Sequence, residues 1–494
     1  MLALTISQIR GLSGTLSDDV FFTTDDGQQG IWQYDAGSSS IVYPDNTGTV
    51  LNTVDGKVIK RIYSGPASVK WFGAKGDGVA DDTTAIQNTI NALAAKGGAA
   101  FMPAGTYRLT ETIQLREAVS LLGEENRNHT VLYGTLLSYE GTGIAIQCYY
   151  PNGNPGEGNV NTISNIVIRG FYLDDKNNTG SIGLDLQGFR WCRLEDVSVS
   201  GFNKGLHTNN NYYSTYGHLQ FIRFRTHAIH SENQDNNTHW EKIRVGKAKE
   251  GSIVTHATNF SYAYDISMAD FCCETDTQHG LCFNYCRGVS VTGYYYESAG
   301  AAAKVSAILL TACQGVNISG GAFQGIGTTD RGVYSHGSDE VVISANWFNG
   351  FEYAIVNSSI TAGDNKNFIQ FNNQIDEIDG DYSRLFADGQ GGGERIGFRH
   401  IEWCRYDAAP RAGSWNKGDI FWRKTAEAGQ PMGFICVAAG TPGTWVEFGQ
   451  MGARTITAAP NIVPNFIGEE VLDTANSKWY KSTGLTAGSW VAIN

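Results

Sequence analysis

The sequence has 494 residues, of which 36 are Lys or Arg and 49 are Asp or Glu, so its formal net charge is −13. Proteins that bind nucleic acid carry a basic surface for the phosphate backbone, so this acidic balance argues against a nucleic-acid partner. Hydrophobic residues make up 41% of the chain and charged residues 17%, which favours an extensive folded core over long disordered segments. Glycine is frequent, at 60 residues, and proline is scarce, at 10, as expected for β structure with many turns.

The nine cysteines form no CxxC pair, and no His/Cys spacing is typical of a metal site, so we predict buried thiols, no metal and no cofactor. The start of the chain lacks the apolar run of a secretory signal. No apolar run reaches the roughly 18 residues of a membrane span, so no membrane insertion is predicted. A protein of this kind that acts outside a cell would reach that place within a particle or by another export route.

Residues 1–66 alternate short apolar runs with turns, which predicts a small β-rich neck or attachment module. One convincing helix follows, with Asp81-Asp82 as its N-cap and a glycine pair, Gly97-Gly98, at its end. Its apolar face consists of Ile86, Ile90 and Leu93. We expect this helix to cover the open edge of the first coil of the repeat that follows.

From about residue 160 the chain repeats a short apolar strand followed by a small residue and an apolar one, in steps of 22 to 29 residues. Short strands at this period, without helices between them, are typical of a parallel β-solenoid. We therefore predict an all-β fold with a single-stranded parallel β-helix over residues 67–404. The small–apolar pairs are Gly183-Leu184, Gly205-Leu206, Ala228-Ile229, Gly280-Leu281, Ala307-Ile308, Gly332-Val333 and Ala354-Ile355, with Gly251 and Ile253 one residue out of phase.

The C-terminal part carries a second repeat. A Gly-acid pair opens each copy, at Gly418 and Gly468, and a Trp closes it, at Trp445 and Trp490. This repeat predicts two small β modules, over residues 405–453 and 454–494.

Residues 69–90, VKWFGAKGDGVADDTTAIQNTI, and the segment GGAAFMPAGTY after them resemble the opening motif of the pectate-lyase-like right-handed β-helix superfamily. This superfamily includes polygalacturonase-related proteins and many phage tailspike depolymerases. The resemblance is close from Val69 to about Leu115 and continues to about residue 400 by pattern only. The polygalacturonase pattern of Asn-Thr-Asp, Asp-Asp, Gly-His-Gly and Arg-x-Lys is not reproduced, so the catalytic residues of that family cannot be transferred to this sequence.

The resemblance implies a right-handed β-helix that acts on a polysaccharide. It also implies a homotrimer, attachment to a phage tail through the N-terminal module, and a location on the virion tail or at a cell surface. The segment ISQIRGLSGTL near the start resembles phage tail-fibre segments. The C-terminal modules resemble those of tail proteins, which implies trimerisation or sugar binding.

The sequence distance from each apolar strand to the next small–apolar pair varies along the repeat. Short gaps of 6, 4 and 6 residues follow Val199, Phe224 and Val245, whereas gaps of 12, 16, 14 and 11 follow Met268, Val291, Ile318 and Ile343. This difference predicts a trough of short turns beside a wall of long ones. A groove of that kind would hold a polymer substrate.

The wall carries a group of acids. With its coils aligned on Met268 and Val291, Glu274 and Glu297 occupy the same position of successive coils, roughly 5 Å apart along the axis. Glycoside hydrolysis requires one carboxyl group to protonate the leaving oxygen and another to act as nucleophile or to activate water. The candidate catalytic residues are therefore Asp270, Glu274, Glu297, Asp276 and His279.

The trough, residues 188–250, holds nine basic and six acidic residues and five of the ten histidines. A locally positive patch suits an anionic sugar chain, and aromatic rings offer flat faces for sugars, although about half of these rings are expected in the core. The candidate substrate-binding residues are Arg223, Arg225, Arg244, Tyr212, Tyr213 and Trp240.

Three functions fit these features. The first is a depolymerase that hydrolyses a bacterial surface polysaccharide or another acidic polysaccharide with paired carboxyl groups. The second is a polysaccharide lyase, in which Arg or Lys neutralises a uronate and Tyr or His removes a proton. The third is a carbohydrate-binding spike or adhesin without catalysis.

Overall fold

The computed structural model describes residues 2–16, 20–125, 134–148, 163–252, 254–298, 306–358, 369–371, 373–375, 386–389, 401–402, 408–409, 411, 415, 417–423, 430–440, 442–449, 454–465 and 467–493. The chain forms two compact units, residues 1–376 with 388–393, and residues 377–387 with 394–494. The predicted end of the solenoid at residue 404 lies outside the described residues. Among the described residues, no helix has the length and apolar character that crossing a membrane requires.

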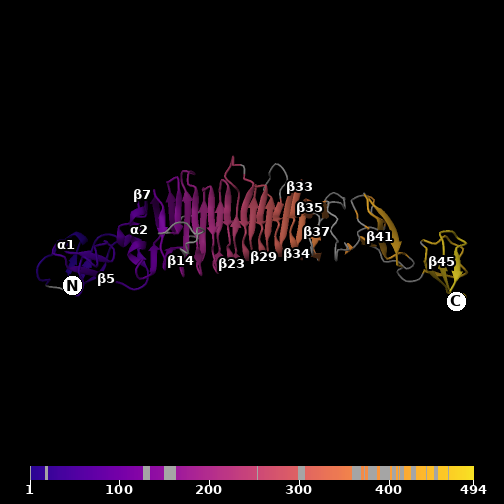
Figure 1. The fold of residues 1–494 in the computed structure, drawn as a ribbon, viewed down its shortest axis with the longest axis horizontal. Coiled ribbons are helices and arrows are strands. Elements are labelled where there is room, and N and C mark those ends of the chain that lie inside the picture. The colour runs from indigo at the N-terminus through magenta and orange to yellow at the C-terminus, as the bar shows by residue number, and fades with distance from the viewer. Residues whose placement is uncertain are drawn as a thin grey trace. The chain divides into compact units, whose positions relative to one another are not determined.

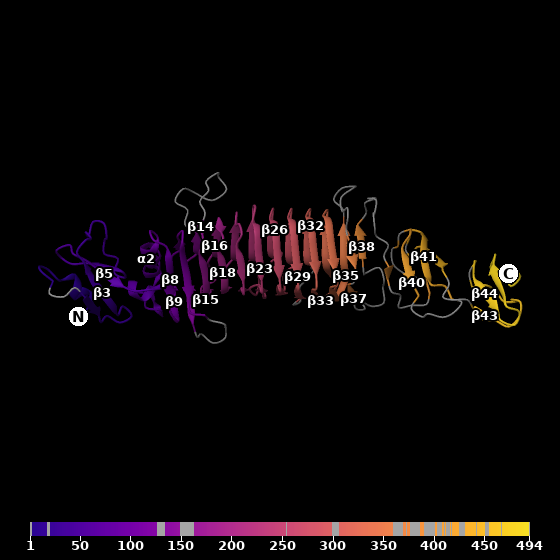
Figure 2. The ribbon, with the colours of Figure 1, turned by 90° about the horizontal axis from the view of Figure 1, so that it is seen from below.

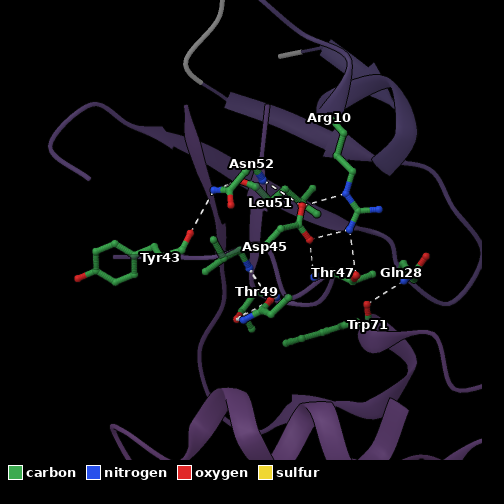
Figure 3. A network of polar contacts seen from close by, with 11 residues as sticks. Arg10, Gln28, Tyr43, Asp45, Thr47, Thr49, Leu51, Asn52 and Trp71 are labelled. Carbon is green, nitrogen blue, oxygen red and sulfur yellow. Dashed lines mark hydrogen bonds and ion pairs between the residues drawn. The ribbon is translucent and has the colours of Figure 1, made fainter. Parts of the chain in front are cut away.

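The predicted N-terminal module is a five-stranded sheet of order β1-β2-β3-β5-β4. Its elements are β1 (Leu2–Leu4), α1 (Ile6–Arg10), β2 (Val20–Thr23), β3 (Gly30–Asp35), β4 (Val50–Asn52) and β5 (Val58–Ile62). The short helix α1, which we did not predict from the sequence, packs Ile6 and Ile9 against the fully buried Trp32. Figure 3 shows how polar contacts hold this module: Arg10 binds the Asp45 carboxylate.

The N-terminal module also contacts the first turn of the solenoid. The Gln28 side-chain amide donates to the Trp71 carbonyl at 2.8 Å, and the Arg61 guanidinium lies 4.5 Å from the Trp71 ring centroid. Arg61 itself is buried, and its guanidinium donates to backbone carbonyls, including that of Gly48 at 2.6 Å. These contacts attach the neck to the segment in which the solenoid begins.

The predicted helix is α2 (Thr83–Leu93), and its buried face includes Ile86, Ile90 and Leu93. The Asp82 carboxylate accepts from the backbone N–H groups of Lys75 and Gly76, so it ties the preceding loop to the helix start. The elements around α2 are β6 (Ala67–Ser68), η1 (Val69–Phe72), β7 (Asp77–Asp81), β8 (Gly98–Met102), β9 (Gly105–Leu109), β10 (Ile113–Leu115), β11 (Val119–Gly123), β12 (Thr135–Tyr139) and β13 (Ile144–Cys148). The helix packs on β8 and β10, at the first coil, as expected.

The solenoid is built from parallel strands in three rows, which we call the first, second and third faces (Figure 1; Figure 2). The long strands β15 (Val167–Asp175) and β18 (Arg193–Ser200) run through both the first and second faces. The first face continues with β20 (Thr215–Gly217), β23 (Asn236–Glu241), β26 (Tyr264–Ala269), β29 (Arg287–Thr292), β32 (Gln314–Ser319), β34 (Asp339–Ser344) and β36 (Ile369–Phe371).

The second face continues with β21 (Gln220–Ile222), β24 (Arg244–Val245), β27 (Cys272–Thr275), β30 (Tyr295–Ser298) and the first parts of β33 (Ala322–His336) and β35 (Trp347–Ser358). The third face consists of β16 (Ile182–Gln187), β19 (Lys204–Asn209), β22 (His227–Glu232), β25 (His256–Ser261), β28 (His279–Asn284), β31 (Ser306–Thr311) and the last parts of β33 and β35. Short pieces complete the solenoid at β14 (Ile163–Ser164), β17 (Phe189–Arg190), β37 (Gln374–Ile375) and β38 (Phe386–Gly389).

The register of the first face corrects the alignment used for the sequence repeat. Its inward column runs through Ile168, Leu194, Tyr216, Trp240, Met268, Val291, Ile318 and Ile343, all at most 1% exposed. Val199 and Val245 belong to the second face instead, where they share an inward column with Cys273. The short gaps after Val199 and Val245 and the long gap after Met268 therefore start on different faces. The predicted difference between a trough and a wall was therefore wrong, because it compared gap lengths that were counted from two different faces.

The third face confirms most of the small–apolar pairs. Leu184, Leu206 and Ile229 are in register, as predicted. The out-of-phase assignment of Gly251 was wrong, because Ala257 and Thr258 hold the place of the small–apolar pair on that coil, where Ile229 pairs with Thr258. Ile253 lies outside the described residues.

The C-terminal unit contains two sheets with the same strand pattern. In each, the first two strands are parallel and the later pairs are antiparallel. The first sheet is β39 (Ile401–Glu402), β40 (Ile420–Trp422), β41 (Gly433–Ala438) and β42 (Thr444–Phe448); the second is β43 (Arg454–Ile456), β44 (Glu470–Asp473), β45 (Lys478–Ser482) and β46 (Trp490–Ala492). The small β structure predicted at both ends of the chain is thus confirmed.

Candidate functional site

Two of the predicted catalytic acids lie side by side on the second face. Glu274 on β27 is the register partner of Glu297 on β30, so the predicted stacking of these residues on successive coils is confirmed. The column continues with Gln324, so the pair is the acidic part of one outward row. Neighbouring parallel strands lie about 4.8 Å apart, which sets the distance between the two side-chain origins.

Each glutamate has a partner from the adjacent outward row. Arg244 Nη2 donates to Glu274 Oε2 at 2.9 Å, and both side chains are partly exposed. The Tyr295 hydroxyl donates to Glu297 Oε2 at 2.9 Å. Arg244 is thus the one predicted substrate-binding residue that the structure joins directly to the predicted acids.

The charges of the pair shift the pKa values of the groups around it. The hydrogen bond to Glu297 raises the pKa of Tyr295, so this phenol stays protonated and donates at neutral pH. The hydrogen bond to Glu274 raises the pKa of Arg244. Burial, and then the Glu274 charge, raise the pKa of Cys272 to about 11, so its thiol is no nucleophile at neutral pH.

The structure does not bring the other three predicted catalytic residues to this pair. Asp270 occupies the corner between the first and second faces with φ of 52°, in line with glycine corners on other coils, and roughly 13 Å of extended chain separates it from Glu274. Asp276 accepts a hydrogen bond from the Ala248 backbone N–H at 3.1 Å. His279 lies on the third face, where its ring stacks on His256 at 5.2 Å.

Two predicted substrate-binding residues are corrected. Trp240 is fully buried and stacks on Tyr216 at 3.9 Å, because its position in the inward column points the ring into the core. The Arg225 guanidinium is held inside the protein by Asn203 at 2.7 Å and by the buried Asp175 at 3.3 Å. Neither side chain presents a free face to a sugar.

The remaining predicted binding residues lie nearer the surface. Arg223 donates to Ser200 at 2.8 Å and pairs with Asp174, while half of its side chain stays exposed. Tyr213 is 55% exposed and stacks on Trp191 at 5.8 Å. Tyr212 is half-buried and lies under the Arg190 guanidinium.

The sequence did not reveal a second polar cluster, on the third face. Asp185, His207 and His230 occupy one outward column on three successive coils. The Asp185 carboxylate accepts a hydrogen bond from His207 Nδ1 at 2.8 Å. Lys204 and Glu232 flank this column. The signal that could have found the cluster is the residue after each small–apolar pair, which is Asp185, His207 and His230 in turn. Within the described parts of the chain, no group of three or more His, Cys, Asp or Glu is placed to hold a metal ion.

The comparisons with known proteins agree with this architecture. A family described as rhamnogalacturonase A/epimerase, pectate lyase-like, matches residues 67–174. The gp42 tailspike of Acinetobacter phage vb_AbaP_AS12 superposes with a TM-score of 0.58 over 100% of this chain and 93% of the tailspike, at 11% sequence identity. The chain folds as a parallel β-helix, and its residues 67–174 match the pectate lyase-like family.

Curated relatives match the chain over shorter stretches. The capsule KN3-specific depolymerase 1 of Klebsiella phage KN3-1 is 28% identical over 187 residues, which is 35% of this chain and 23% of the relative. Plasmin and fibronectin-binding protein A of Streptococcus pneumoniae is 38% identical over 153 residues, which is 30% of this chain and 17% of the relative. This chain thus spans less than a quarter of the length of either relative.

Proposed function

We propose that this chain is a polysaccharide depolymerase that hydrolyses glycosidic bonds, with Glu274 and Glu297 as its catalytic carboxyl groups. The observation that carries the proposal is the register pairing of these two residues on β27 and β30. The inter-strand spacing of about 4.8 Å is close to the ~5–5.5 Å between the two carboxyl groups of retaining glycosidases.

The partners of the two glutamates suggest their roles. Arg244 places a positive charge 2.9 Å from Glu274, which suits a carboxylate that attacks the sugar as a nucleophile. Glu297 has the uncharged Tyr295 hydroxyl as its partner, and no cation is bonded to it among the described contacts, so we assign it the other role, in which its acid form protonates the leaving oxygen. A covalent glycosyl–enzyme intermediate would follow, and water activated by Glu297 would then release it.

The proposed substrate is a bacterial surface polysaccharide. Two similar proteins support this substrate. One is named as a capsule-specific depolymerase of Klebsiella phage KN3-1, and the other is a tailspike of an Acinetobacter phage. In the same view the chain is a homotrimeric component of a virion tail, attached through the N-terminal module, or acts outside the cell. A trimer fits the rule that most assemblies of identical chains have closed symmetry.

A binding function without catalysis is the second candidate. Its support is the similarity to plasmin and fibronectin-binding protein A of Streptococcus pneumoniae. Screening of purified protein on capsular, O-antigen and plant polysaccharides distinguishes the candidates. New reducing ends without an unsaturated, ultraviolet-absorbing product would support hydrolysis, an unsaturated product would support the lyase, and binding without release of oligosaccharides would support the adhesin.

A further inference from the structure

The polar cluster of the third face places one carboxylate oxygen among three nitrogens. Glu232 Oε1 is hydrogen-bonded to His230 Nε2, lies 3.6 Å from Lys204 Nζ and lies 3.8 Å from His207 Nε2. These side chains come from two neighbouring strands, β19 and β22, whose residues pair in register. The three nitrogens form a nest that a negatively charged group fills.

The side chains of this cluster differ in burial: Asp185 and His207 are buried, and Glu232 is partly exposed. The side chain of His207 is 10% exposed and that of Glu232 is 39% exposed. Asp185 is at least as buried as His207, and its carboxylate is bonded to His207 Nδ1 at 2.8 Å, which fixes the orientation of the ring. The His207 ring is therefore held in place, whereas the Glu232 carboxylate is exposed enough to move toward solvent.

The His207 ring ends in an unsatisfied atom. Its Nε2 is buried and has no hydrogen-bond partner, because 3.8 Å is too long for a hydrogen bond to Glu232. A buried polar atom without a partner costs free energy that a ligand can recover. A carboxylate that is not tied to the β22 backbone could approach both Lys204 and His207 more closely than Glu232 does.

The groups around the nest leave Lys204 as its permanent positive charge. Burial and the charge of Lys204 lower the pKa of His230. Burial, followed by the charges of His230 and Lys204, lowers the pKa of His227 to about 3, and the His227 ring lies 4.6 Å from that of His230. These two histidines are neutral at pH 7, so the anion in the nest is held by the Lys204 ammonium group and by the Nε2–H of His230. His207 donates to the same anion in the form of the ring that carries a proton on both nitrogens, because its Nδ1–H donates to Asp185.

We propose that Lys204, His207 and His230 form a binding site for the carboxylate of an acidic sugar, and that the Glu232 carboxylate is its exchangeable internal occupant. The occupant already present fixes the ligand chemistry, because a site that holds a protein carboxylate matches the charge and geometry of a uronate. That the carboxylate belongs to a sugar rests on the proposed function. The site itself is distinct from the glutamate pair, since it lies on the third face and the pair lies on the second.

The test measures binding of glucuronate, with glucose as the uncharged comparison, by calorimetric titration or by NMR shifts of the histidine rings. Glu232→Gln removes the internal competitor but keeps its size, so glucuronate affinity should rise about tenfold, which corresponds to about 1.4 kcal/mol. Lys204→Met should lower the affinity at least as much. Glucose should show no preference among the variants.

Glu241→Gln is the matched control. Glu241 is a comparably exposed acid on β23, the next strand along the chain, and it also lies 3.8 Å from a histidine, His239, but on the first face. An equal gain of affinity in Glu241→Gln would reduce the effect to overall charge and overturn the proposal. An unchanged or lower affinity in Glu232→Gln, with a melting temperature equal to that of the wild type, would also overturn it.

This outcome is independent of the proposed hydrolysis. Glucuronate binding in Glu232→Gln does not require the glutamate pair, and it should persist in a Glu274→Gln/Glu297→Gln variant. Conversely, a chain that hydrolyses polysaccharide but whose glucuronate affinity is insensitive to Glu232→Gln and Lys204→Met would retain the proposed function and lose the anion site.

Discussion

The Asp270 carboxylate lies against the backbone of Gly293 on the next coil. A Cβ at Gly293 would stand only 2.9 Å from Asp270 Oδ1. Both residues occupy the corner between the first and second faces, with φ of 52° and 66°. Gly293→Ala should therefore add backbone strain of about 1–2 kcal/mol and also crowd the carboxylate. We expect a lower melting temperature in thermal unfolding.

Gly320→Ala separates these two contributions. Gly320 stands in the same corner with φ of 67°, but the nearest atom to its Cβ would be 3.8 Å away. Gly320→Ala should be destabilised by the backbone strain alone and should remain more stable than Gly293→Ala. Equal losses in both variants would mean that the Asp270 carboxylate exerts no crowding.

Trp240 acts in the core. Trp240→Ala should lower the free energy of unfolding by about 3–5 kcal/mol, because it empties a fully buried position stacked on Tyr216. Tyr213→Ala removes a ring that is 55% exposed and should cost less than about 1.5 kcal/mol. Denaturant unfolding of the two variants checks this order, and similar losses would contradict the assigned places of the two rings.

His279 makes stability depend on pH. Burial, followed by the charges of His256 and Arg331, lowers the pKa of His279 from 6.5 to about 4. Below pH 6.5 the unfolded chain takes up a proton that the folded chain takes up only near pH 4. The contribution of His279 to stability is therefore present above pH 6.5 and is lost as the pH falls toward 4.

His279→Gln should flatten the stability profile between pH 6.5 and pH 4, as measured by urea unfolding at a series of pH values. His239→Gln removes a histidine whose side chain is 45% exposed and serves as the control. An unchanged slope of stability against pH in His279→Gln would contradict the assignment of this slope to the buried His279.

The sequence predicted the fold well where the pattern was local. The helix α2 was found because its cap, its apolar spacing and its closing glycines are all within one segment. The column of Glu274 and Glu297 was found because Met268 and Val291 are true register partners, so the count of six residues along each coil was the same.

The sequence failed where one pattern served two faces. Val199 and Val245 have the same apolar-x-apolar spacing as Met268, yet they line the second face, and only the strand register separates them. Trp240 was misassigned for the same reason. The contacts of His207 with Asp185 and with Glu232 join residues 22 and 25 positions apart, and the repeat was interpreted for its small–apolar pairs alone, without the polar residue that follows each of them.

The spacing of the glutamate pair predicts the stereochemistry of cleavage. Two carboxyl groups that start about 4.8 Å apart leave no room for a water molecule between carboxylate and sugar, so the anomeric configuration of the product should be retained. NMR spectra recorded early in the digestion, before mutarotation, report the anomer that forms first. Inversion would rule out a nucleophilic role for Glu274.

The most direct test of the account is the rate of reducing-end release from a polysaccharide that the protein cleaves, compared among the wild type, Glu274→Gln, Glu297→Gln and Asp270→Asn. Asp270→Asn is the matched control, because Asn tolerates the positive φ of that corner and Asp270 lies outside the pair. The account predicts a loss of about 10²–10⁴-fold in each glutamine variant and an almost unchanged rate in Asp270→Asn. Full activity in both glutamine variants, or a loss confined to Asp270→Asn, would contradict it.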